Sequence, residues 1–226
     1  MDNVVEYEDL IIPVYAINAY GNKAGLAHIR EQFKYKKEFD LNIVEAGEQR
    51  ISQSGLWGSI VRIITLAVEN KDDVIIICED DHEFTDSYSK EYLFQNIIEA
   101  NEQGVNVLTG GVTGFSHIVP VTQNRYWVDF FGCTKFIIIY KSIFKQILSE
   151  CFCEDDIVDI KLSELSSNKM ILHPFICGQK EFSDVPPAMY SQYQQDRVVA
   201  DRFDMSSKRL ERIRRIYDRY VLGKPQ

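Results

Sequence analysis

The sequence predicts an α/β fold, with a mixed and mostly parallel sheet flanked by helices. Strand and helix patterns alternate along the first part of the chain, which is typical of a sheet with helices on its faces. The run from Val74 to Cys78 is continuously apolar and β-branched up to the cysteine, as in a strand buried on both faces. No linker rich in proline, glycine and serine divides the 226 residues. We therefore expect one domain over residues 1–205, with a basic C-terminal helix over 206–226 packed on it.

Seven apolar runs are the predicted strands, because most of them are rich in β-branched or aromatic residues. They cover residues 11–18, 41–44, 74–78, 105–108, 126–131, 135–140 and 170–176. Pro174 interrupts the last run, and proline cannot donate a hydrogen bond to a neighbouring strand. We therefore expect the last strand to be broken near Pro174.

Six segments with apolar residues at helical spacing are the predicted helices. In the first of them, Leu26, Ile29 and Phe33 repeat among lysine and glutamate residues. The six segments cover residues 26–33, 56–68, 92–100, 142–149, 157–165 and 206–221. Residues 183–196 are polar and include Pro186 and Pro187, so we expect a loop there.

Charge is unevenly distributed along the chain. The net charge is −9, whereas proteins that bind nucleic acid broadly carry a basic surface, so we expect no nucleic-acid partner. Residues 206–226 hold seven basic and two acidic residues, a net charge of +5, which leaves −14 on the rest of the chain. The basic helix either packs on this acidic body or makes a peripheral contact with anionic lipid headgroups.

The five cysteines indicate a reducing compartment. Cys151 and Cys153 are separated by one residue, which is not the spacing of a redox pair or of a zinc site of the usual pattern. The acidic start of the chain does not resemble a signal peptide, and no apolar run approaches the roughly 18 residues of a membrane span. We therefore expect a cytoplasmic protein, whose membrane contact would be peripheral and at the inner face.

Three consecutive acids, Glu79, Asp80 and Asp81, directly follow the Val74–Cys78 run. Ligands of open α/β sheets bind beyond the carboxyl ends of the strands, and Mn²⁺ and Mg²⁺ prefer oxygen ligands. Alternate residues of an extended segment point the same way, so Glu79 and Asp81 can share a face. We expect Asp81 to be the main metal ligand, with Glu79 or Asp80 reaching metal-bound water or a ribose. The alternative is that these acids cap a helix or lie on a solvated loop.

The segment from Val74 to Phe84 resembles the strand and EDD motif of glycosyltransferase family 25. That family includes bacterial lipooligosaccharide galactosyltransferases and the collagen galactosyltransferases. Further segments resemble parts of the family in the same order, namely residues 11–33, 55–59, 132–138, 156–160, 173–179 and 183–185. The EDD segment is the specific part of the resemblance.

The resemblance implies a GT-A-like fold and an inverting, metal-assisted transfer. A hexose, galactose or glucose, would move from a UDP-sugar to a saccharide or lipid-linked saccharide acceptor, in the synthesis of cell-surface polysaccharide or lipopolysaccharide. A carboxylate would take the proton of the attacking hydroxyl, and the candidates are Asp159, Asp129 and Asp184. We assign the nucleotide to Asn18, Glu45, Ser54, Glu79 and Asp80. We assign the Mn²⁺ or Mg²⁺ ion to Asp81, Glu79 and His173.

Two other functions remain as alternatives. Asp81 to Thr85 approximates the Asp-x-Asp-x-Thr motif of haloacid-dehalogenase-like phosphatases, with Glu83 in place of the second aspartate. A catalytically degenerate module that still binds a nucleotide is the non-enzymatic alternative.

Overall fold

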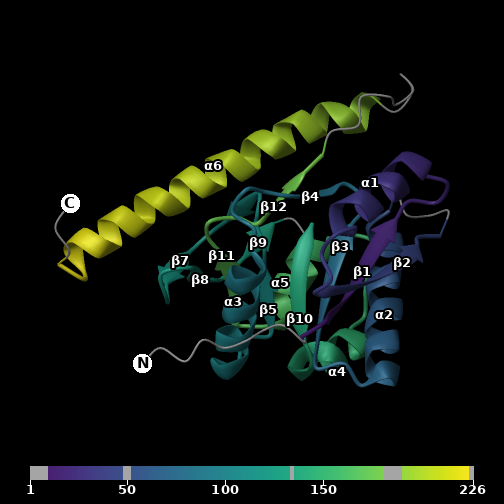
Figure 1. Ribbon diagram of the computed structural model, residues 1–226, viewed down its shortest axis with the longest axis horizontal. Helices are drawn as coiled ribbons and strands as arrows, with labels where there is room; N and C mark the ends of the chain where they lie inside the picture. The colour runs from purple at the N-terminus through teal and green to yellow at the C-terminus, as the bar shows by residue number, and fades with distance from the viewer. Residues whose placement is uncertain (1–9, 48–51, 133–134, 181–189, 224–226) are drawn as a thin grey trace.

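The computed structural model describes residues 10–47, 52–132, 135–180 and 190–223, with side chains omitted over 190–200. Its centre is an eight-stranded sheet in the order β2-β1-β3-β10-β5-β11-β8-β7 (Figure 1). The strands are β1 (Ile12–Asn18), β2 (Phe39–Glu45), β3 (Val74–Glu79), β5 (Val107–Thr109), β7 (Ile118–Pro120), β8 (Arg125–Val128), β10 (Phe136–Tyr140) and β11 (Lys169–Leu172). Within this sheet β8 and β10 run opposite to the other strands. The predicted mixed, mostly parallel sheet is confirmed.

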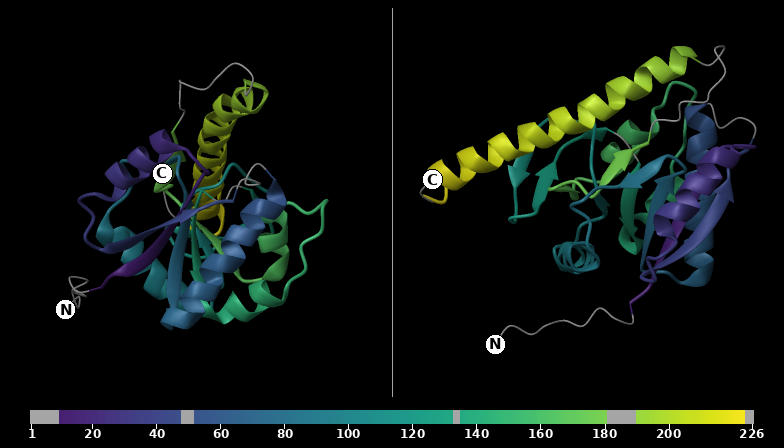
Figure 2. Two further views of the ribbon diagram at one scale, coloured as in Figure 1. Left: turned by 90° about the vertical axis from the view of Figure 1, so that its right-hand side faces the viewer. Right: turned by 45° about the horizontal axis from the view of Figure 1, so that its top comes forward.

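Helices cover both faces of the sheet, as predicted. They are α1 (Lys23–Phe33), α2 (Gln53–Asn70), α3 (Lys90–Glu102), α4 (Lys141–Ser149), α5 (Val158–Leu165) and α6 (Tyr190–Tyr220). Figure 2 shows α2, α4 and α5 on one face and α1 and α3 on the other. The long α6 crosses the edge of the sheet at which β1, β3 and β11 end (Figure 1). Among the described helices, none combines the length and the apolar character that a membrane crossing requires.

Two short antiparallel pairs lie outside the main sheet. β4 (His82–Phe84) pairs with β12 (Cys177–Gln179), and β6 (Gly114–Phe115) pairs with β9 (Phe131–Gly132). The strand predicted over 126–131 is therefore two strands, because the chain leaves the main sheet after Val128. The expected break near Pro174 is confirmed, since β11 ends at Leu172.

The helix at the C-terminus is longer than predicted. It begins at Tyr190, so the loop predicted over 183–196 is wrong from residue 190 onward, and the helix predicted over 206–221 begins earlier. The polar composition of the first turns concealed them, because extending an existing helix adds one backbone hydrogen bond per residue without requiring an apolar face.

The core explains why β3 and β10 occupy the centre of the sheet. Ile75, Ile76 and Ile77 of β3 are buried, and so are the residues Ile137–Ile139 that pair with them. Each such side chain contributes about 1.5–3 kcal/mol when it leaves water, and a strand that is apolar on both faces gains this only between two layers of helices. The acids at the end of β3, Glu79 to Asp81, therefore lie at the edge of the sheet.

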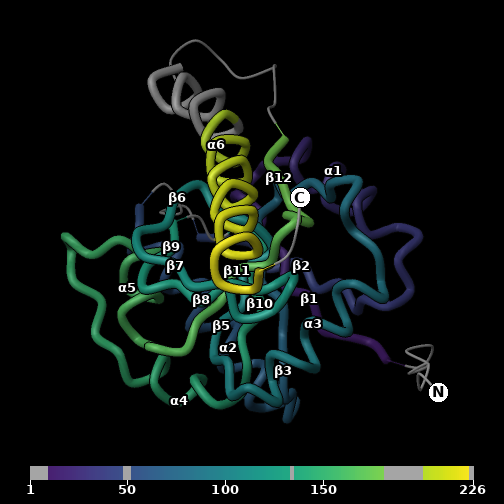
Figure 3. The backbone as a smooth tube through the Cα atoms, turned by 90° about the vertical axis from the view of Figure 1, so that its left-hand side faces the viewer, coloured from purple at the N-terminus to yellow at the C-terminus, as the bar shows by residue number. Residues whose placement is uncertain are grey.

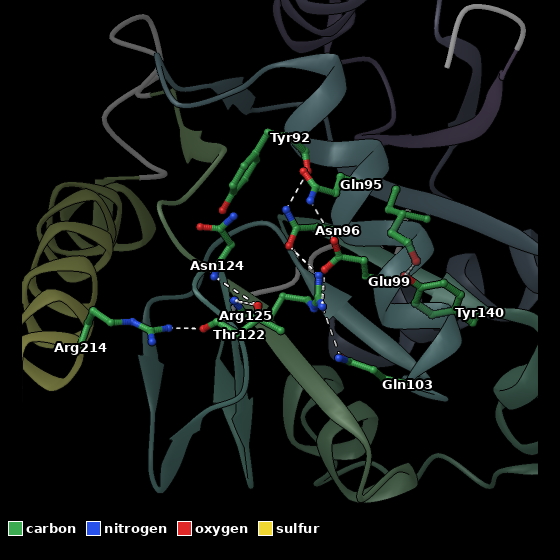
Figure 4. A network of polar contacts seen from close by, with 11 residues as sticks. Tyr92, Gln95, Asn96, Glu99, Gln103, Thr122, Asn124, Arg125, Tyr140 and Arg214 are labelled. Atoms are coloured by element: carbon green, nitrogen blue, oxygen red, sulfur yellow. Dashed lines mark hydrogen bonds and ion pairs between the residues drawn. The ribbon is translucent and has the colours of Figure 1, made fainter. Parts of the chain in front are cut away.

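A buried arginine connects β8, near one edge of the sheet, to helix α3 (Figure 4). Arg125 on β8 is completely buried. Its Nη1 donates to Oδ1 of Asn96 (2.8 Å), and its Nη2 forms an ion pair with Glu99 (2.8 Å) and donates to Oε1 of Gln103 (3.4 Å). All three partners belong to α3 or its C-terminal cap. This network fixes β8, which lies near the edge of the sheet, to the helix that covers it.

Candidate functional site

The ends of three neighbouring strands define the candidate site. In the parallel register of β1 with its two neighbours, Asn18 lies opposite Glu45, and Ile17 lies opposite Glu79. Asn18 is buried, whereas Glu45 is exposed. The structure thus brings Asn18, Glu45 and Glu79, three of the residues assigned to a nucleotide, to one edge of the sheet. This edge is the place where α/β sheets bind ligands.

Asp80 anchors the end of β3 to the turn before α1. Its Oδ2 accepts hydrogen bonds from the backbone N–H of Ala19 (2.9 Å) and from Nδ2 of Asn22 (3.0 Å). Asn22 is the N-cap of α1, and its Oδ1 accepts from the N–H of Gly25 (3.0 Å). The buried carboxylate of Asp80 therefore stabilises the loop that follows β1 and the first turn of α1, in keeping with the helix-capping alternative for this acid.

Substituting Gly25 should disrupt this anchor. A Cβ at Gly25 would lie 2.3 Å from Nδ2 of Asn22 and 2.8 Å from Oδ2 of Asp80, so Gly25→Ala should lower the free energy of unfolding by about 1–3 kcal/mol. Gly58 is the matched control, because it lies inside α2 and a Cβ there meets nothing within 4 Å. Gly58→Ala should instead raise stability by about 0.5–1 kcal/mol through helix propensity. Urea unfolding measures both, and a stabilised Gly25→Ala protein would contradict the role of Asp80.

Glu79 and Asp81 share one cation. The ammonium of Lys135 lies 3.2 Å from a carboxylate oxygen of Glu79 and 2.9 Å from Oδ2 of Asp81. All three side chains are largely buried. Glu79 and Asp81 converge on the same nitrogen atom, although Asp80 and Asp81 lie in a turn after β3 and not in an extended segment. The unit that the structure assembles is thus two carboxylates and one lysine.

Burial changes the acidity of Asp81. It raises the pKa of this carboxyl to about 6, against the opposing effect of Lys135. The neighbouring charge of Glu79 also raises this pKa, since like charges disfavour ionisation. Asp81 therefore carries its negative charge at neutral pH but takes up a proton in mild acid.

The two carboxylates fit a divalent cation of the magnesium type. Such ions are often held by one or two protein carboxylates together with substrate phosphates and water. Within the described ranges, Oδ1 of Asp81 is buried without a hydrogen-bond partner, so this oxygen is available as a ligand. The same ranges contain no cluster of three or more His, Cys, Asp or Glu residues that could hold a metal by themselves. A cation here would therefore rely on phosphate oxygens for the rest of its coordination.

His82, next to Asp81, belongs to the core. Its ring packs against Phe84 and Phe136, with centroid distances of 4.4 and 4.8 Å, and it is completely buried. Burial lowers the pKa of His82 to about 3, so the ring is neutral at pH 7. Its backbone carbonyl lies 2.8 Å from Nε2 of His28. The histidine pair fixes β4 against α1 directly behind the candidate site.

The three candidate bases lie in different places. Asp159 is in the first turn of α5, and the preceding Val158 donates its backbone N–H to Gln53 at the start of α2 (2.9 Å). Both helices run from the site edge of the sheet back to the start of a parallel strand, so Asp159 and Ser54 lie at the same edge as Glu79. Asp184 lies outside the described residues.

Asp129 is separated from the acids at the end of β3 along the sheet, because β10, β5 and β11 lie between β8 and β3. It follows β8, which runs against β3, and its carboxylate lies 2.6 Å from Nδ1 of the exposed His117. The hydrogen bond from His117 lowers the pKa of Asp129. The structure therefore does not bring Asp129 to Glu79 and Asp81.

His173 contacts α6. Its Nε2 lies 3.2 Å from Oγ of Ser207, and its ring packs edge-on against Tyr126 and Phe175. It follows β11, and β10 and β5 separate that strand from β3, a distance of about 14 Å at the usual strand spacing. The metal ligands assigned from the sequence are thus not gathered at one point, and the pair that is gathered is Glu79 and Asp81.

Lys135 and Asn22 are site residues that the sequence interpretation missed. Lys135 precedes β10, whose antiparallel pairing with β3 places its first residue, Phe136, opposite Cys78. A lysine just before an apolar strand is an available signal, but it becomes specific only once that strand is known to lie beside β3. Asn22, in the Gly-Asn turn before a helix, carries the recognisable pattern of an N-cap.

The phosphatase motif is not arranged as a phosphatase site. Glu83, which would be the acid, is exposed on β4, whereas Asp81 is largely buried with Lys135. Thr85 donates its hydroxyl hydrogen to the carbonyl of Phe175 (2.6 Å). The motif residues therefore point to different surroundings.

Comparisons with known proteins give a likeness of fold. No protein-family model matches the sequence, and no curated protein matches it. Among solved structures, the chain resembles A197 from STIV, with a TM-score of 0.53 and 13% sequence identity over 76% of this chain and 87% of that chain. It also resembles apo UDP-glucose pyrophosphorylase (TM-score 0.43, 12% identity, 75% of this chain and 74% of that chain). A third is a glycosyltransferase involved in the glycosylation of the major capsid of PBCV-1 (TM-score 0.37, 10% identity, 59% and 63%). The likeness to A197 shows that this chain shares its α/β fold with a protein of very different sequence.

Proposed function

We propose that the protein is a metal-assisted glycosyltransferase that transfers a hexose, galactose or glucose, from a UDP-sugar to a saccharide or lipid-linked saccharide acceptor with inversion. The observation that carries the proposal is the pair of buried carboxylates, Glu79 and Asp81, around one cation at the ligand-binding edge of the sheet. The resemblance of the EDD segment to glycosyltransferase family 25 supports the same chemistry. The resemblance also points to cell-surface polysaccharide or lipopolysaccharide synthesis.

The site has the charges that a nucleotide diphosphate requires. Departure of the diphosphate leaves negative charge that has to be stabilised, and a bound Mn²⁺ or Mg²⁺ would supply that stabilisation. Glu79 and Asp81 would hold the ion. Lys135, already between them, can turn its ammonium to a phosphate oxygen while it remains close to the carboxylates. Asn18 and Glu45 line the same edge and would contact the nucleoside.

Asp159 is the preferred base of the three candidates. An inverting transfer needs a carboxylate on the face of the sugar opposite the nucleotide, within reach of the acceptor hydroxyl. Asp159 lies at the site edge on the α5 side, whereas Asp129 follows β8, which three strands separate from β3. The carboxylate of Asp159 would receive the hydroxyl proton as the oxygen attacks the anomeric carbon.

Thermal unfolding with UDP and Mn²⁺ tests the proposal. Ligand at about 100 times its dissociation constant adds about 2.7 kcal/mol, which should raise Tm by about 5–10 °C for a chain of this size. Because Lys135 already neutralises part of the carboxylate charge, Mn²⁺ alone should have a smaller effect than Mn²⁺ with UDP. Asp81→Asn should abolish the joint effect. Asp73→Asn should retain the joint effect, because Asp73 is an exposed acid that directly precedes the start of β3, away from the site.

Four results would contradict the proposal. UDP could fail to stabilise the protein at any Mn²⁺ concentration, or Asp81→Asn could bind as well as the unaltered chain. Phosphate release from p-nitrophenyl phosphate without a UDP response would instead support the phosphatase. Metal-dependent UDP binding without sugar transfer or UDP-sugar hydrolysis would support a degenerate nucleotide-binding module.

A further inference from the structure

The basic residues of α6 are divided between two faces of the helix. Arg209 and Arg214 face the body of the protein. Arg209 donates to the carbonyls of Phe115 (3.0 Å) and Ser116 (3.2 Å), and Arg214 donates to the hydroxyl of Tyr126 (3.1 Å) and to the carbonyls of Thr122 and Gln123. These two arginines dock the helix through neutral oxygens. The inward-facing arginines therefore do not pair with acidic residues of the body of the protein.

Four further basic residues of α6 face away from the body. Lys208, Arg212, Arg215 and Arg219 are spaced by four, three and four residues, which aligns them on one side of a helix. All of them are exposed, while Ser206 and Leu210 on the opposite side are buried. Figures 1 and 3 show α6 as a rod along the outside of the molecule, so this side of the helix is uncovered. We call it the outer face of α6.

Exposed apolar side chains accompany these arginines. Ile216 is 50% exposed and Tyr220 is 72% exposed, and Val221 and Leu222 follow at the end of the helix with 64% and 48%. A groove of about 390 Å³ is lined by Arg212, Arg215, Ile216, Arg219 and Tyr220. Leu222 also lines a cavity of about 700 Å³ between α6 and the turn that joins β7 and β8, whereas Ile216 and Tyr220 do not.

Three cations near the end of the helix take part in none of the described ion pairs, although the exposed Glu211 lies one turn before Arg215. Lys208 pairs with Asp204 (2.6 Å), and Asp218 contacts the inward-facing Arg214 (3.8 Å). Among the described ion pairs, none includes Arg212, Arg215 or Arg219. The last two turns of α6 thus present three arginines beside exposed aliphatic and aromatic groups.

We propose that the outer face of α6 docks on an anionic lipid bilayer. Guanidinium groups bind phosphate oxygens in a bidentate manner, and interfacial helices bury their apolar side chains at the boundary of headgroups and acyl chains. A polyanion such as nucleic acid would satisfy the arginines but would leave Ile216, Val221 and Leu222 in water. A bilayer satisfies both kinds of group, and this inference stands whether or not the chain is a transferase.

Vesicle co-sedimentation of the full chain tests this inference. The chain should bind phosphatidylcholine vesicles that contain phosphatidylglycerol, and it should not bind vesicles of phosphatidylcholine alone. Each basic residue near a membrane contributes about fivefold in affinity, so the triple variant Arg212→Gln, Arg215→Gln, Arg219→Gln should bind on the order of 100-fold more weakly. The double variant Ile216→Ser, Tyr220→Ser should also bind several-fold more weakly, because it removes apolar area but no charge.

A second triple variant controls for net charge. Lys34, Lys37 and Lys145 are exposed on other elements, so Lys34→Gln, Lys37→Gln, Lys145→Gln removes the same charge away from α6. This protein should bind vesicles as the unaltered chain does. Circular dichroism checks that every variant keeps its fold, which exposed substitutions should leave intact.

Four outcomes would overturn the inference. The unaltered chain could fail to bind anionic vesicles, or both triple variants could bind equally well. The chain could also bind heparin or duplex DNA with an affinity that the apolar variant leaves unchanged, which would indicate a general polyanion surface. A concentration-dependent dimer that disappears in the arginine variant would show that a second copy occupies this face instead.

Discussion

We expect Lys135→Met to lower the free energy of unfolding by about 3 kcal/mol at pH 8. Lys135 is the cation that Glu79 and Asp81 share, at 3.2 and 2.9 Å. Without it, two largely buried carboxylates lose the cation that they share. Methionine keeps most of the side-chain volume, so the loss reports on charge more than on packing.

The loss should be smaller at pH 5. Asp81 has a folded-state pKa raised to about 6, above that of the unfolded chain, so its ionisation opposes folding as the pH rises through the folded value. Removing Lys135 takes away the favourable charge and raises this pKa further. Below the new pKa, Asp81 is protonated in the folded variant, and the repulsion between the two acids disappears. The difference between variant and unaltered chain should therefore grow from pH 5 to pH 8.

Urea unfolding at the two pH values measures this effect, with Lys141→Met as the control. Lys141 pairs with Asp73 at the same distance, 2.9 Å, but both side chains are well exposed. Exposed ion pairs contribute little to stability, so this variant should change little and should show no special dependence on pH. Equal losses for Lys135→Met and Lys141→Met, or a Lys135→Met loss independent of pH, would contradict the charge arrangement of the site.

Arg125→Ala should destabilise the protein by about 3–5 kcal/mol. Arg125 is completely buried, and its guanidinium supplies the donors for Asn96 and Gln103. The substitution leaves a cavity and also leaves the buried Oδ1 of Asn96 without a donor, which adds the cost of an unsatisfied acceptor to the cost of lost packing. β8 would then lose its side-chain connection to α3 (Figure 4).

Glu99→Gln is the matched control for this network. The side chain of Glu99 is 40% exposed whereas Arg125 is completely buried, and the glutamine introduced there can still accept a hydrogen bond from the guanidinium, so the loss should be about 1–3 kcal/mol and smaller than for Arg125→Ala. Thermal or urea unfolding of both variants gives the comparison. If Glu99→Gln proved as damaging as Arg125→Ala, the ion pair rather than the buried hydrogen bond to Asn96 would hold β8 in place.

Local patterns in the sequence were sufficient for most of the fold. The run Val74–Cys78 predicted a central strand, and the structure places β3 there. The apolar spacing in α2 and α5 gave helices close to their observed positions, since these helices bury one face. The first turns of α6 were missed because they are polar. Apolar residues at helical spacing reveal a helix that buries one face. A helical segment that buries no face lacks this spacing and is missed.

The candidate site could likewise be predicted only in part from local patterns in the sequence. The sequence indicated that the acids lie at the end of an apolar strand, and β3 ends at Glu79. The turn at Asp80 and Asp81, and not the alternation of an extended segment, brings Asp81 to the cation that Glu79 contacts. The partner of these acids does not follow from local patterns, because Lys135 lies 54 residues beyond Asp81. Lys135 reaches the two acids because β10, which comes later in the chain than β3 and β5, lies between these two strands in the sheet.

The sequence by itself thus determined which segments are strands and helices, that the sheet is mixed, and that acids end its central strand. These are consequences of residues that are adjacent or one turn apart. Only the tertiary structure decided that Asp80 holds a turn, that Lys135 joins Glu79 and Asp81, that His173 contacts α6, and that α6 turns three arginines outward. Each of these depends on the order of strands and on packing between distant segments, which is set by burial of the whole core and not by any local pattern.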